Sequence, residues 1–65
     1  MIKCRLRVLL AEHELSQKEL AEMTGIQAMT INKMYNNSIV RVPLEAIDKI
    51  CEALQCDVSD LFKRE

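Results

Sequence analysis

The stretch LSQKELAEMTGIQAMTINKMYNN, residues 15–37, places the only glycine of the chain between two segments of helical character. Ser16 is a good helix N-cap, and the glutamate three residues later completes a capping-box pattern. The first segment ends at Gly25, because glycine adopts the left-handed conformation beyond a helix end most easily. The second segment begins at Gln27 and reaches about Asn36. Two short helices joined by a turn of about three residues that contains glycine predict a helix-turn-helix.

Three further helices are expected on either side of this motif. One runs from near Cys4 to Glu14, and the three residues before it either continue it or are extended. Pro43 suits the first turn of a helix, and apolar residues then recur every three or four positions as far as Leu54. Asp57 can cap a last short helix, after which the tail is frayed or extended. The apolar stripe of the fourth helix consists of Leu44, Ile47, Ile50, Cys51 and Leu54.

The composition favours an all-α fold. With one glycine and one proline in 65 residues, tight β-hairpins are hard to build. Tyr35 and Phe62 are the only aromatic residues, so Leu, Ile, Met and Val must form the core. We therefore predict a compact five-helix bundle, with residues 1–65 as a single domain. A chain of this size buries only about 60% of its unfolded surface, so a partner subunit would help to stabilise it.

Charge and cysteine usage narrow the function further. The formal net charge is −1: residues 1–41 carry six Lys/Arg against four Glu, whereas residues 42–65 carry three basic and six acidic residues. The three cysteines are odd in number and lack CxxC spacing, and His13 is not in zinc-ligand spacing with them. No signal peptide or long apolar run is present. The expectation is a cytoplasmic protein with reduced thiols, no metal, no cofactor and no membrane association.

Residues 15–37 resemble the helix-turn-helix of the Cro and lambda-repressor class, also called the xenobiotic-response-element (XRE) class. The later stretch LEAIDKICEALQCDVSDLF, residues 44–62, is similar to the closing helices of that class. The resemblance extends over roughly residues 4–62 and is strongest to minimal members that consist of this domain alone. It implies a lambda-repressor-like DNA-binding domain with its motif at about 16–36. The shared features are Ser16-Gln17, Leu20-Ala21, Gly25-Ile26, Thr30-Ile31 and Asn36.

Three positions depart from the pattern of this class. Asn37 stands where glycine commonly follows the asparagine that closes the second helix of the motif. The loop NSIVRVP, residues 37–43, is less basic than in many members, and Leu10 replaces an arginine often found in the first helix. Each departure removes a phosphate contact or a constraint on the loop.

The resemblance places the helix at residues 27–36 in the major groove, where its N-terminal half reaches base edges. Asparagine can pair with adenine, lysine can donate to guanine, and Ala28 and Met29 suit thymine methyl groups. The alternative is a helix face that is only solvated. The residues assigned to base reading are Gln27, Ala28, Met29, Asn32 and Lys33.

Three residues are assigned to phosphate contacts: Gln17, Asn36 and Arg41. The class uses the glutamine to contact a phosphate and to brace the recognition helix, whereas the alternative is an ordinary residue at a helix start. Gly25 forms the turn and is expected to contact no ligand. Packing is the expected role of Thr30, Tyr35 and His13.

Two functions remain open from the sequence. The first is a sequence-specific, double-stranded-DNA-binding transcriptional regulator, a repressor that acts as a homodimer. Its interface lies either on a second stripe of the first helix or at the apolar C-terminal end near Val58 and Phe62. The second is a protein-binding module, such as an antitoxin or anti-repressor partner. An enzyme is disfavoured, because no nucleophile–base set, carboxylate pair or glycine-rich phosphate loop is present. The stripe on the first helix consists of Cys4, Val8 and Ala11.

Overall fold

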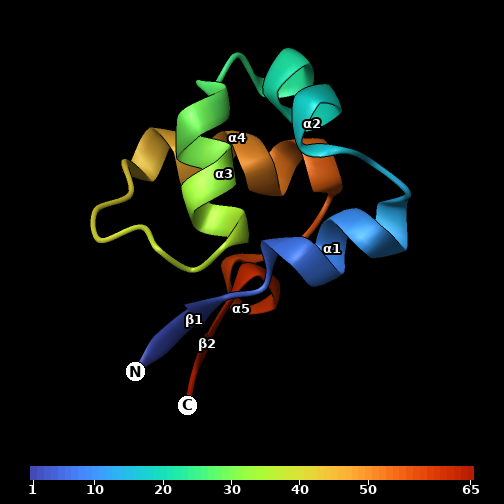
Figure 1. Ribbon diagram of the computed structural model, residues 1–65. Coiled ribbons are helices and arrows are strands. Elements are labelled where there is room, and N and C mark those ends of the chain that lie inside the picture. The colour runs from blue at the N-terminus through green and yellow to red at the C-terminus, as the bar shows by residue number, and fades with distance from the viewer.

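The computed structural model describes all 65 residues as five helices and two short strands (Figure 1). This confirms the predicted helical class and its five helices, and adds a small sheet made by the two ends of the chain. In chain order the elements are β1 (Ile2–Cys4), α1 (Leu6–His13), α2 (Gln17–Thr24), α3 (Ala28–Tyr35), α4 (Leu44–Leu54), α5 (Val58–Leu61) and β2 (Phe62–Arg64).

The terminal strands β1 and β2 pair in antiparallel register, with Ile2 opposite Arg64 and Cys4 opposite Phe62. Figure 1 shows both chain ends emerging side by side below α1 and α5. The all-α prediction drawn from glycine and proline content did not include this sheet, because a low content of turn residues excludes only strands joined by a tight turn. Strands from opposite ends of the chain need no such turn, and for this reason the composition did not reveal them. The first helix consequently begins at Leu6, later than the predicted start near Cys4.

A cluster of ten buried residues holds the helices together. The first helix contributes Leu6, Leu9 and Leu10 to it. Cys4, however, is 6% exposed and lies in β1. It therefore does not belong to a surface stripe with Val8 and Ala11. The cluster comprises Cys4, Leu6, Leu9, Leu10, Leu20, Ile31, Met34, Ile50, Leu54 and Leu61.

Two other packing predictions are wrong. Leu44 is 82% exposed, because the fourth helix begins at this residue and its side chain projects beyond the core. Ala46 is buried on that turn instead. His13 is also exposed, since it occupies the last position of α1, beyond the buried residues of that helix.

The helix ends follow the local signals in the sequence. Ser16 Oγ accepts a hydrogen bond from the Glu19 N–H at 3.0 Å, and Glu19 Oε1 accepts one from the Ser16 N–H at 3.2 Å. Asp57 forms the equivalent capping box at the start of α5. Left-handed residues follow α1, α3 and α4, namely Glu14, Asn37 and Gln55. These caps and C-terminal turns bond the backbone groups that helix ends leave unpaired.

The three cysteines are free thiols. Burial raises the pKa of the Cys4 thiol, and a backbone hydrogen bond from Leu6 partly offsets this effect. The pKa of Cys56 is raised to about 11, first by burial and then by the neighbouring Cys51 thiol and two acidic residues. Cys4 and Cys56 are therefore neutral at physiological pH and poor nucleophiles.

Candidate nucleic-acid interface

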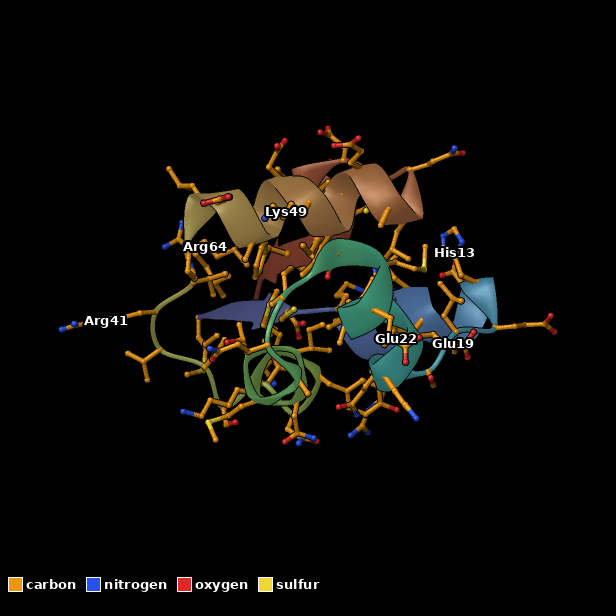
Figure 2. The ribbon with its side chains drawn as sticks, turned by 90° about the horizontal axis from the view of Figure 1, so that it is seen from above. His13, Glu19, Glu22, Arg41, Lys49 and Arg64 are labelled. Atoms are coloured by element: carbon orange, nitrogen blue, oxygen red, sulfur yellow. The ribbon has the colours of Figure 1, made fainter.

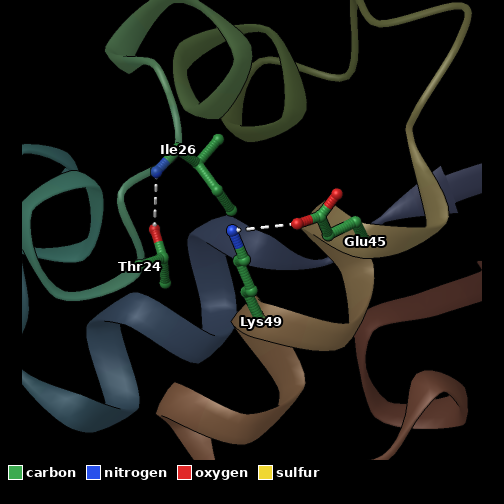
Figure 3. Close-up of polar contacts among 4 residues, drawn as sticks. All are labelled: Thr24, Ile26, Glu45 and Lys49. Carbon is green, nitrogen blue, oxygen red and sulfur yellow. Dashed lines mark hydrogen bonds and ion pairs between the residues drawn. The ribbon is translucent and has the colours of Figure 1, made fainter.

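The turn between α2 and α3 is built around Gly25, which has φ 76° and donates its N–H to the Ala21 carbonyl at 2.8 Å. Thr24 fixes the next step of the chain. Its hydroxyl donates to the Leu20 carbonyl at 2.8 Å. The same oxygen accepts from the Ile26 N–H at 3.3 Å, as Figure 3 shows. Ile26 is half-buried against the core. The turn is therefore closed by local hydrogen bonds and anchored by one apolar side chain.

This turn sets the direction of α3. Ile31 and Met34 are completely buried, while Tyr35 is half-buried against the core. The opposite side of the helix is open to solvent, and Met29 is 68% exposed there. The structure thus brings all the residues assigned to base reading to the exposed surface at the start and outer side of α3: Gln27, Ala28, Met29, Asn32 and Lys33.

A chain of three side-chain amides links α2 to α3. Asn36 Nδ2 donates to Asn32 Oδ1 at 3.2 Å, and Asn32 Nδ2 donates to Gln17 Oε1 at 3.1 Å. A carboxamide has two N–H donors and two acceptor lone pairs. Asn32 therefore retains one donor and one acceptor, while the Gln17 amide keeps both N–H groups for another partner. Gln17 and Asn36, both assigned to phosphate contacts, are thus hydrogen-bonded to Asn32, which is assigned to base reading.

Arg41, the third residue assigned to phosphate contacts, lies in the loop between α3 and α4. Figure 2 shows its side chain extending away from the body of the molecule. Arg41 and Lys33 line a hollow of about 410 Å³ beside α3, together with Thr30 and Pro43. The loop therefore adds a cation next to the C-terminal half of α3, although Arg41 does not contact the amide chain.

The charges on α3 and α4 differ. Helix α3 contains one lysine and no acidic residue, whereas α4 contains Glu45, Asp48 and Glu52, all exposed. The one ion pair in the structure joins Lys49 Nζ to Glu45 Oε1 at 3.2 Å on α4 (Figure 3). In Figure 2, α4 lies on the side of the molecule opposite α3. A polyanion would therefore meet less repulsion at α3 than at α4.

One basic residue near this surface was not assigned a role from the sequence. The Arg7 guanidinium carbon lies 4.9 Å from the centroid of the Tyr35 ring. The two residues are far apart in the sequence, and no local pattern signals the contact. Leu10, by contrast, is 2% exposed, so the position at which the class often carries arginine belongs to the core.

Comparisons with known proteins agree with this geometry. Residues 5–65 match the family described as Cro/C1-type HTH DNA-binding domain. An uncharacterized HTH-type transcriptional regulator of Bacillus subtilis strain 168, YozG, is 30% identical over 56 residues, which cover 86% of this chain and 67% of YozG.

Two solved structures are also similar. A candidate DNA-binding protein from Bacteroides fragilis superposes with a TM-score of 0.83 at 30% identity, covering 97% of this chain and all of the other. The transcriptional regulator VanUg gives a TM-score of 0.79, also at 30% identity, covering 95% of this chain and 81% of VanUg.

The chain belongs to the family of Cro/C1-type helix-turn-helix DNA-binding domains. It is a DNA-binding regulator of the helix-turn-helix type. None of its helices is both long enough and apolar enough to span a bilayer.

Proposed function

We propose that the protein is a sequence-specific repressor that occupies a promoter as a homodimer, with α3 in the major groove of double-stranded DNA. The observation that carries this proposal is the outer face of α3, which is exposed, free of acidic residues and braced against α2 through Asn32 and Gln17. YozG and VanUg are both described as transcriptional regulators, which supports the same role. The proposal places the protein in the cytoplasm with the DNA that it binds.

Base reading falls to Gln27, Ala28, Met29, Asn32 and Lys33. The donor and the acceptor left on Asn32 are the pair that binds adenine at N7 and N6, while Lys33 can donate to guanine. Met29 and Ala28 offer apolar contacts to thymine methyl groups. Among these five residues only the Asn32 side chain is preorganised, because hydrogen bonds to Gln17 and Asn36 hold it on both sides.

Phosphate contacts are assigned to Gln17, Asn36 and Arg41, which surround the reading face. Gln17 follows the N-cap of α2, where backbone N–H groups also favour a phosphate. Its free amide N–H groups can donate to the same phosphate, while its oxygen stays on Asn32. These contacts position the protein on the duplex and carry no sequence information.

A homodimer follows from size and charge. One such domain buries only about 600–1,000 Å² of its own surface on DNA, and a net charge of −1 limits the non-specific electrostatic attraction. Two copies on a two-fold site, with recognition helices about 34 Å apart, would double the contact. Because Cys4 is buried, we favour the interface at the C-terminal end, where Val58 is 51% exposed and Phe62 is half-buried.

The test is fluorescence anisotropy with the upstream region of the gene as a duplex, at two salt concentrations. Binding should weaken steeply as salt rises, because phosphate contacts release counterions. Absence of binding at low salt would refute the regulator. Sedimentation at high micromolar concentration tests the dimer separately, and a monomeric mass there would count against it.

The reading role is tested by Asn32→Ala. The expected loss is about 1–3 kcal/mol on the preferred site, with little change on random DNA and no loss of fold. Glu52→Ala, an exposed change on α4, is the control and should leave both affinities unaltered. An equal loss on both duplexes would show that Asn32 is not a reader.

Met29 supports a second candidate function, that of a protein-binding module. A methionine exposed by 68% on the outer face of α3 suits an apolar protein surface. Binding built on Met29 would change little with salt, whereas DNA binding would not tolerate high salt. A Met29→Ala variant that loses a protein partner but keeps its DNA affinity would favour this alternative.

A further inference from the structure

We propose that Arg7 on α1 is an additional DNA-backbone contact, held between Gln17 and Asn36 by stacking on Tyr35. The inference rests on the proposed DNA-binding function and extends its surface beyond α2, α3 and the loop that follows. Three independent features carry it: the support of the guanidinium, its position between two residues assigned to phosphates, and the absence of a carboxylate partner.

Tyr35 supports the Arg7 side chain. The guanidinium carbon lies 4.9 Å from the ring centroid, within the range of a cation–π contact. The ring itself is half-buried and packs against the core, so it is a fixed platform at the last position of α3. The contact restrains the guanidinium over the ring, and its N–H groups form no ion pair within the protein. This geometry matches a phosphate, which binds the guanidinium edge through two parallel hydrogen bonds.

Two neighbouring hollows place Arg7 between the residues assigned to phosphates. One, of about 340 Å³, is lined by Arg7 together with Gln17 and Tyr35. The other, of about 360 Å³, is lined by Arg7 together with Tyr35 and Asn36. Arg7 therefore borders both the start of α2 and the end of α3. A backbone that runs from Gln17 toward Asn36 would pass the guanidinium.

The charge at Arg7 is not neutralised within the protein. The one ion pair of the structure is on α4, so Arg7 has no carboxylate within ion-pair distance. Lys3 and Arg5 line the second hollow as well, with Glu65 as the only acidic side chain around it. Three basic side chains and one acidic side chain therefore border this hollow beside α3, although the whole chain carries −1. An excess of positive charge at a surface attracts a polyanion such as the DNA backbone.

The experiment compares Arg7→Gln with Arg64→Gln in salt series on the preferred duplex and on a scrambled duplex. Both variants lose one positive charge, but Arg64 lies on the α4 side of the molecule in Figure 2, away from α3. For Arg7→Gln the slope of log affinity against log salt should become shallower by about 0.9. Affinity should fall about tenfold on both duplexes, because a backbone contact carries no sequence information.

Arg64→Gln should keep the slope of the wild-type protein. If the slope of log affinity against log salt for Arg7→Gln equals that of wild type and of Arg64→Gln, the proposed Arg7–phosphate contact is wrong. The proposed DNA-binding function would still stand. Wild-type protein that binds neither duplex at low salt would instead overturn the regulator, and the Arg7 contact with it. Thermal melting of each variant sets the temperature at which all of them are folded.

Arg7→Lys separates the stacked guanidinium from simple charge. Lysine keeps the charge but is a point donor without the planar fork. The slope should therefore stay near the wild-type value, while affinity falls on both duplexes. Wild-type affinity for Arg7→Lys would overturn the role of the guanidinium held on Tyr35.

Discussion

Gly25 adopts φ 76° at the turn, yet a Cβ added there would meet no heavy atom within 4 Å. The position thus requires glycine for backbone conformation and not for space. The sequence alone predicted both the left-handed turn and its place. It could not distinguish a conformational requirement from a close approach of the two helices, because that depends on how the neighbouring side chains pack.

Gly25→Ala should therefore cost about 1–2 kcal/mol of the free energy of unfolding, the penalty of a left-handed residue with a Cβ. Urea unfolding at equilibrium measures it. Gly25→Asn should cost less, since asparagine tolerates this conformation better. DNA affinity of the folded alanine variant should be unchanged, because Gly25 contributes no side chain to the surface. A loss well above this range would indicate a clash that the structure does not contain.

Two side-chain contacts of this surface have no local signal in the sequence, although the resemblance implied that Gln17 braces the recognition helix without giving its partner. The Asn32–Gln17 hydrogen bond spans 15 positions, and the Arg7–Tyr35 contact joins two different helices. Each depends on the angle at which helices cross, which no local pattern encodes. The residues of α3 that face outward were predictable, because helical periodicity and the apolar positions determine which side is buried.

At the scale of the elements, local signals located the helix ends and failed for the strands. Ser16, Gly25 and Asp57 each act through residues within four positions, so the sequence was sufficient. The β1–β2 pair joins the two ends of the chain, and its hydrogen bonds appear only once the helices have brought those ends together. The exposed Leu44 has a similar cause: periodicity continued a stripe into the first residue of α4, beyond the reach of the core.

The capping box of α2 gives an element-scale prediction. Ser16→Ala removes the acceptor for the Glu19 N–H and should lower the free energy of unfolding by about 1 kcal/mol. Thermal or urea unfolding measures the change, and helix content of the folded state should be nearly unaltered. Ser16→Asp keeps an acceptor and adds a charge that suits a helix N-terminus, so it should retain wild-type stability. Equal destabilisation by both changes would mean that the hydroxyl does not act as a cap.

At the scale of the whole molecule, one side chain links the terminal sheet to the recognition helix. Asn37, the left-handed residue after α3, accepts from the Cys4 N–H at 2.6 Å and donates to the Cys4 carbonyl at 3.1 Å. The sequence identified Asn37 only as a departure from glycine. In the structure the Asn37 amide hydrogen-bonds both main-chain groups of Cys4, as a residue of a neighbouring strand would. The two residues are 33 positions apart in the sequence.

Asn37→Gly tests this link, since glycine accepts the left-handed conformation but offers no amide. The Cys4 N–H would lose its partner in a half-buried place, an effect worth about 1–3 kcal/mol that relief of the backbone at residue 37 partly offsets. Overall stability is therefore a weak measure, and hydrogen exchange is the better one. The Cys4 amide should exchange much faster in the variant. The N–H of Lys3, the preceding residue of β1, points to the other side of the strand, toward β2, so this amide should keep its protection. Unchanged protection at Cys4 would show that the core holds β1 without Asn37, and that the strand and the recognition helix are not coupled through this side chain.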